Sequence, residues 1–164
     1  MYGHWFLVAS QRSAKIFSEI PDLRKLGLVQ LIENPLGHEK RTALIRKQAG
    51  RGVRSAGRGQ SVHYSDAGNH DPQVDASQQF AKEVSRFLEA ARQEKKFLTL
   101  TVVAEPHFLG MLRASMGSEL NKVVVRWLNK DLQKTPQTRL SEYLLAKNKE
   151  AGDTAAEFSV RFMY

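Results

Sequence analysis

The stretch FLTLTVVA, residues 97–104, is a continuous run of apolar and β-forming residues. Such a run is typical of a central strand that is covered on both faces. Before it, residues 73–96 repeat their apolar side chains at helical spacing, which predicts an amphipathic helix. After it, Glu105 and Pro106 start a second helix that Gly117 ends. This helix–strand–helix order indicates an α/β fold in which helices cover a sheet.

The segments on either side add further strands. Residues 5–10 (WFLVAS), 14–20 (AKIFSEI) and 28–33 (LVQLIE) predict an antiparallel meander at the N-terminus, and its apolar Trp5 and Phe6 are expected in the core. Residues 123–128 predict a fifth strand, with Trp127 fitting either a buried or a surface role. We therefore expect a single α/β domain over residues 1–150, with a mixed sheet made of the meander and the helix-connected strands.

The C-terminal part contributes a third helix and a tail. Residues 139–149 place leucines on one side and lysines on the other, which predicts an amphipathic helix. Residues 157–164, EFSVRFMY, alternate apolar and polar side chains as a strand does. The tail at residues 151–164 is therefore interpreted as a docking strand, at a sheet edge or on a partner.

Composition narrows the class of protein. The chain has 164 residues, a formal net charge of +8 and a pI of about 9.9, which favours nucleic acid, an anionic membrane surface or an acidic protein as partner. The lack of cysteine excludes disulfides, thiolate metal sites and cysteine catalysis. No apolar run approaches the roughly 20 residues of a spanning helix, and the first residues lack a basic region of the signal-peptide kind. We expect a cytoplasmic protein that does not enter membranes.

Much of the positive charge lies in residues 40–63, KRTALIRKQAGRGVRSAGRGQSVH. This segment contains no acid, and its basic residues are Lys40, Arg41, Arg46, Lys47, Arg51, Arg54 and Arg58. Arginine forks and glycines that permit close backbone approach suit a polyanion such as RNA. We predict a short helix within residues 39–48 and a long basic loop at about 49–72. The alternative is a solvated surface loop.

No motif identifies a catalytic or metal centre. The histidines form no HxxxH or HxH pair, and the chain has neither a Walker pattern nor a GxSxG elbow. His63 and His70 lie near Asp66 and Asp71 in the predicted loop, where a metal or acid–base pair is conceivable but solvated histidines are more common. We expect no metal and no cofactor.

Five runs of the sequence form a recognisable set: WFLVASQRSAKIF, LIENPLGH, AGRGVRSAGRGQSVHY, FAKEVSRFLEAARQEKKFLTLTVVAEPHFLGMLR and Lys130-Asp131-Leu132. Together they resemble the bacterial host-attachment protein family, whose members are labelled as required for attachment to host cells. The resemblance covers residues 3–148. This family is similar in turn to the central domain of archaeal and eukaryotic class-1 release factors and of Pelota, which implies an RNase H-like α/β fold.

The resemblance also implies a site. Release factors carry a Gly-Arg-Gly-Gly-Gln-Ser loop between the early strands and the long helix, and it enters the peptidyl-transferase centre of the ribosome. Residues 57–61, Gly-Arg-Gly-Gln-Ser, occupy the equivalent place with one glycine fewer. Gln60 is then the glutamine counterpart and the one candidate catalytic residue. The implied RNA-binding set is Arg41, Arg46, Lys47, Arg51, Arg54, Gly57, Arg58, Gly59, Gln60, Ser61 and His63.

These observations leave competing functions. The first is a translation factor of the ribosome hibernation or rescue type that inserts the loop near the tRNA or peptidyl-transferase region, with the ribosome, rRNA and tRNA as partners. The alternative is an attachment-related protein that acts through a protein partner. An enzyme, either a peptidyl-tRNA hydrolase using Gln60 or a nuclease, is less favoured. A nuclease of the RNase H type needs clustered carboxylates for magnesium, and residues 5–10 and 97–104 contain none.

Overall fold

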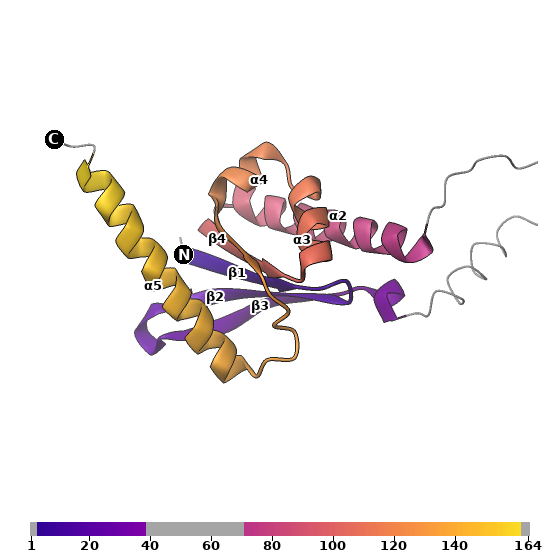
Figure 1. Ribbon diagram of the computed structural model, residues 1–164, viewed down its shortest axis with the longest axis horizontal. Helices are drawn as coiled ribbons and strands as arrows, with labels where there is room; N and C mark the ends of the chain where they lie inside the picture. Colours follow the sequence, from indigo (N-terminus) through magenta and orange to yellow (C-terminus); the bar gives the residue numbers. More distant parts are fainter. Residues whose placement is uncertain (1–2, 39–70, 162–164) are drawn as a thin grey trace, which may run out of the picture.

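The computed structural model describes residues 3–38 and 71–161, which form one mixed five-stranded sheet with helices on both faces (Figure 1). The strands are β1 (Gly3–Ala9), β2 (Ser13–Ile20), β3 (Lys25–Glu33), β4 (Phe97–Ala104) and β5 (Val124–Asn129). The α-helices are α2 (Pro72–Gln93), α3 (Pro106–Ser115), α4 (Ser118–Val123) and α5 (Gln137–Arg161), and the short 3-10 helices are η1 (Pro21–Leu23) and η2 (Pro35–His38).

The strand order in the sheet is β3-β2-β1-β4-β5. β1 pairs with β2, and β2 with β3, in antiparallel fashion, whereas β1 pairs with β4, and β4 with β5, in parallel. The predicted α/β class, the N-terminal meander and the helix-connected strands are therefore confirmed. This is also the RNase H-like arrangement that the resemblance implied. It brings the carboxyl ends of β1, β4 and β5 to the same edge of the sheet.

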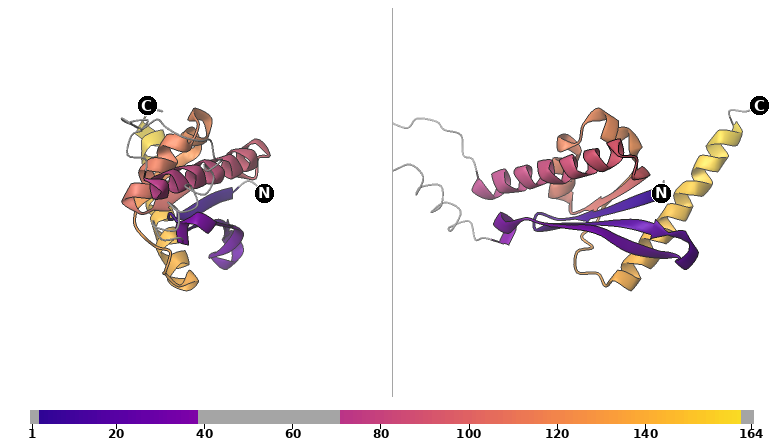
Figure 2. Two further views of the ribbon diagram at one scale, coloured as in Figure 1. Left: turned by 90° about the vertical axis from the view of Figure 1, so that its right-hand side faces the viewer. Right: turned by 180° about the vertical axis from the view of Figure 1, so that it is seen from behind.

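The sheet is covered on both faces because its central strands alternate apolar side chains to each side. On one face Trp5 and Leu7 pack with Phe80 of α2 and Phe108 of α3 in the larger core cluster. On the other face Phe6 packs in a smaller cluster to which α5 contributes Leu140 and Leu144. Figure 2 shows this layering, with α2, α3 and α4 on one side of the sheet and α5 on the other. The prediction that Trp5 and Phe6 belong to the core is confirmed, since both are buried.

The C-terminal prediction needs a correction. The helix expected over residues 139–149 continues to Arg161, so the strand predicted for 157–164 is wrong as far as Arg161, and residues 162–164 lie outside the described part. The alternating pattern also places Phe158 and Phe162 four residues apart, a spacing that suits a helix equally well. The preceding residues are rich in alanine, lysine and glutamate, which have high helix propensity and extend α5.

Two other boundaries refine the sequence predictions. α2 begins at Pro72, with Asp71 as its N-cap accepting a hydrogen bond from the Gln73 amide at 3.0 Å. The predicted loop over residues 49–72 therefore ends before Asp71. The short helix expected within residues 39–48, and the rest of that loop, lie outside the described residues. The helix that starts at Pro106 ends at Ser115, and α4 was not anticipated.

Candidate nucleic-acid interface

The two elements that flank segment 39–70 lie together at one end of the sheet. η2 precedes the segment and α2 follows it, and these two helices contact each other (Figures 1 and 2). η2 is fixed to the turn between β1 and β2 through Asn34, which is 4% exposed. The Asn34 side-chain amide donates to the Gln11 carbonyl at 2.8 Å, and the Asn34 backbone amide donates to the Arg12 carbonyl at 2.8 Å. The base of segment 39–70 is therefore held against this turn.

Gly37 explains how closely η2 approaches the same turn. A Cβ atom at this position would lie 2.5 Å from the Gln11 carbonyl oxygen and 3.0 Å from the Arg12 Cα atom. Both are backbone atoms, so any side chain at position 37 would push η2 away from the turn. Position 37 of the NPLG turn thus requires glycine, because a larger residue would prevent the close approach of η2 to the β1–β2 turn.

A polar cleft lies beside this anchor, at the carboxyl ends of the parallel strands. It has a volume of about 340 Å³ and is lined by Ser10, Gln11, Arg12, Glu105, Asp131, Gln133 and Lys134. Ser10 follows β1, Glu105 follows β4, and Asp131 comes two residues after β5. The carboxyl ends of parallel strands are the usual position of ligand sites in open α/β sheets, because loops from several strands converge there.

Gln133 fixes one wall of the polar cleft. Its Nε2 donates to the Val8 carbonyl at 3.1 Å and to the Ser13 carbonyl at 3.0 Å, and its Oε1 accepts from the Ser13 hydroxyl at 3.1 Å. Its backbone amide donates to Asp131 Oδ1 at 3.2 Å. The connection between β5 and α5 is thereby tied to the β1–β2 hairpin. No pattern in the sequence indicated this role, because glutamine at a loop position carries no periodic signal.

The polar cleft gathers charges of both signs that do not neutralise one another. Arg12 and Lys134 supply two cations, and Glu105 and Asp131 supply two carboxylates. Among the side chains that the structure describes, in residues 3–38 and 71–149, none of these four forms an ion pair. Glu105 Oε1 accepts from the Gln11 amide at 3.4 Å, and Asp131 accepts from the Gln133 amide. The charges are therefore available to a ligand.

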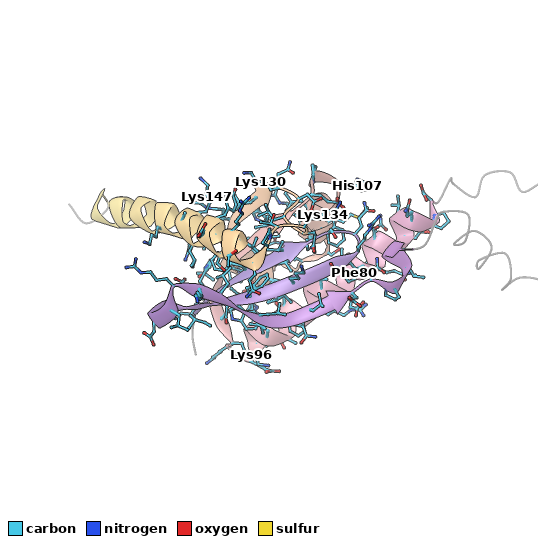
Figure 3. All side chains as sticks on the ribbon, turned by 90° about the horizontal axis from the view of Figure 1, so that it is seen from below. Phe80, Lys96, His107, Lys130, Lys134 and Lys147 are labelled. Carbon is cyan, nitrogen blue, oxygen red and sulfur yellow. The ribbon has the colours of Figure 1, made fainter. Side chains whose placement is uncertain are left out.

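A basic strip continues from the polar cleft along the α5 side of the molecule. Figure 3 shows Lys134, Lys130 and Lys147 in succession on this side, whereas Lys96 lies on the opposite side of the view. Lys130 Nζ lies 4.6 Å from the ring centroid of Tyr143, a cation–π contact that holds the side chain against α5. We use the name basic strip for Lys130, Lys134 and Lys147.

The charge of the C-terminal half was missed in the sequence analysis. Residues 113–149 contain eight Lys or Arg residues and three Asp or Glu residues, a net charge of +5. Residues 39–70 contain seven basic and two acidic residues and have the same net charge. A running count of charge along the chain would have found this second region. The positive charge of residues 113–149 is harder to recognise in the sequence because its lysines are spread over helices and loops.

The predicted RNA-binding residues all lie within residues 39–70, outside the described part of the structure. The set from Arg41 to His63, with Gln60 as the candidate catalytic residue, therefore stays a prediction. Among the described residues, no group of three His, Asp or Glu side chains is placed to hold a metal ion. No helix of the described part is long and apolar enough to cross a membrane.

Both a family model and a solved structure match this chain. The fold defines the chain as an α/β protein in which a mixed sheet carries a basic insertion between its meander and its first long helix. A family model described as "Protein required for attachment to host cells" matches residues 5–144, and the chain belongs to this family. The family resemblance drawn from the sequence motifs is confirmed.

One similar solved structure is the crystal structure of the archaeal translation termination factor aRF1. It matches with a TM-score of 0.39 and 9% sequence identity, over 96% of this chain and 42% of the termination factor. The chain thus spans less than half the length of that protein. The search of curated proteins gave no match to the sequence.

Proposed function

We propose that the protein is an RNA-binding factor that acts on the ribosome, with the basic segment 39–70 as its principal contact. The observation that supports this proposal is the position of the elements that flank the segment. η2 is bonded to the β1–β2 turn, whose Gln11 and Arg12 line the polar cleft, and η2 also contacts α2. The described part of the chain adds further cations, Arg12 and Lys134 in the polar cleft and the remaining lysines of the basic strip. The alternative of a merely solvated basic loop offers no reason for this second group of cations.

The physical basis of binding is the release of counterions from RNA phosphates. Each phosphate neutralised by a lysine or arginine releases condensed cations, so the affinity falls steeply as salt rises. A rigid base for the segment lowers the entropy that must be lost when it contacts RNA, because its two ends are already in place. The folded domain therefore holds the two elements that flank a segment that is too basic and too rich in glycine to form a core of its own.

The ribosome is proposed as the target on the basis of the sequence resemblance. Residues 57–61 correspond to the release-factor loop that enters the peptidyl-transferase centre. In a hibernation factor this segment would occupy the tRNA or peptidyl-transferase region without chemistry. In a rescue factor Gln60 would take part in release of the peptide. A Gln60→Ala variant that retains ribosome binding but loses peptide release would favour rescue.

The test is co-sedimentation of the purified full-length protein with ribosomes at several salt concentrations. Reversing three charges with Arg51→Glu, Arg54→Glu and Arg58→Glu should abolish co-sedimentation. In binding to isolated rRNA fragments, the same change should reduce the slope of log affinity against log salt by about 2–3. Retention of wild-type binding and salt slope by the triple variant would reject the segment as the RNA contact.

A matched control reverses three exposed charges elsewhere. Lys82→Glu, Arg86→Glu and Lys96→Glu change the net charge by the same amount, on α2 and just beyond its C-terminal end, and none of the three residues lines the polar cleft. If binding is local to the proposed surface, this control should retain most of its affinity. An equal loss in both triple variants would show that only overall charge matters and would contradict a defined interface.

The second candidate function is attachment through a protein partner, which the description of the family favours. The two proposals differ in their response to nuclease. A protein that stays in a large complex from cell lysate after RNase treatment, and that fails to co-sediment with purified ribosomes, would support the attachment function and reject the ribosomal one.

A further inference from the structure

We infer that the polar cleft holds one ribonucleotide of the bound RNA. In this arrangement Arg12 and Lys134 contact phosphate, and the 2′-hydroxyl group of the ribose donates a hydrogen bond to Glu105 or Asp131. The inference rests on the proposed function and deepens it, because it states which chemical feature of the nucleic acid the described part of the site recognises. It predicts a preference for RNA over DNA of the same sequence.

The carboxylates are the observation that requires explanation. A surface that bound only phosphates would gain nothing from Glu105 and Asp131, because they repel the polyanion that the neighbouring cations attract. Neither carboxylate is neutralised by an ion pair among the described residues. A ligand that combines an anionic group with hydrogen-bond donors satisfies both kinds of charge. A ribonucleotide is such a ligand, since its phosphate is anionic and its 2′-hydroxyl can donate.

Both carboxylates are oriented by the protein before any ligand arrives. The Gln11 amide donates to Glu105 Oε1, and the Gln133 amide donates to Asp131 Oδ1. Each contact uses one oxygen and leaves the other oxygen of the carboxylate to accept a further bond. An acidic side chain at the carboxyl end of a parallel strand accepts ribose hydroxyls in the same manner in dinucleotide-binding sheets.

Ser10 adds a hydroxyl group to the floor of the polar cleft. The residue is 9% exposed, and its Oγ accepts a hydrogen bond from the Arg12 backbone amide at 3.2 Å. Within the described residues, no acceptor for its own proton lies at hydrogen-bonding distance. A buried hydroxyl of this kind gains from an acceptor, and phosphate or ribose oxygens supply one. The cleft volume is at the lower end of the range for small-ligand sites, about 300–1,000 Å³.

The test compares the affinities of the full-length protein for a short single-stranded RNA and for DNA of the same sequence, by fluorescence anisotropy at fixed salt. The wild type should bind RNA several-fold more tightly. The double variant Glu105→Gln, Asp131→Asn keeps the oxygens that accept from Gln11 and Gln133 but removes the charge. Its RNA affinity should fall about tenfold, because charge-assisted hydrogen bonds become neutral ones. Its DNA affinity should stay equal or rise, because two repulsive charges are gone.

The control variant is Glu83→Gln, which removes one exposed carboxylate from α2 that does not line the polar cleft. It should raise RNA and DNA affinity slightly and equally. If the double variant also raises both affinities equally, the carboxylates are only repulsive and the inference is wrong, although the proposed function stands. Equal affinity of the wild type for RNA and DNA would also show that the inference is wrong, although the proposed function would stand. A wild type that binds neither nucleic acid overturns the proposed function as well.

Discussion

Replacing Gln133 with methionine should destabilise the protein and displace one wall of the polar cleft. Methionine has nearly the same length and volume, so packing changes little, but the three side-chain hydrogen bonds to Val8 and Ser13 are lost. Each such bond contributes a net of about 0.5–1.5 kcal/mol, and a carbonyl that loses its donor near the core adds a desolvation cost. We expect the free energy of unfolding to fall by about 2–4 kcal/mol.

The assay is urea denaturation followed by tryptophan fluorescence, for which the buried Trp5 provides a probe. With a urea dependence of about 2 kcal/mol per molar, the midpoint should fall by about 1–2 M. The control is Gln30→Met, because Gln30 is exposed and, among the described residues, its side chain bonds only to the adjacent Leu31 carbonyl, at 3.2 Å. A Gln133→Met midpoint no lower than that of Gln30→Met would refute the structural role assigned to Gln133.

Two further predictions concern pH and the base of the basic segment. Burial lowers the pKa of His4 from 6.5 to about 4; folding therefore disfavours its protonation, and stability should be lost as pH falls from about 6.5 to about 4. The shift sets an upper bound of about 3 kcal/mol, and partial exposure reduces the expected loss to about 1–2 kcal/mol. Urea midpoints at pH 7 and pH 5 should show a smaller decrease for His4→Gln than for the wild type. Gly37→Ala should cost about 1–3 kcal/mol through its contact with the Gln11 carbonyl and should weaken RNA binding; unchanged stability and affinity would mean that η2 does not need this close approach.

The fold was predictable to the extent that its signals are local. The run at residues 97–104 became β4 with the same bounds, because a central strand that is covered on both faces is mostly apolar. The helix at 73–96 became α2 because its apolar residues follow the helical period. The strand predicted for the tail failed as far as Arg161, because alternation over only a few residues does not distinguish a strand from a helix. The extension of α5 to Arg161 depends on propensity accumulated over the preceding turns.

The candidate site, like the fold, was only partly predictable from the sequence. The net charge, the basic segment at residues 39–70 and the positions of the strands could be read from the sequence, because these depend on residue type and short-range spacing. The fold alone brings Ser10, Glu105 and Asp131 into one cleft, since they are 95 and 26 residues apart in the chain and converge because β1, β4 and β5 run parallel. The fold also joins the β5–α5 connection to the first hairpin through Gln133. Contacts between distant residues are set by strand order and packing, which leave no periodic trace in the sequence.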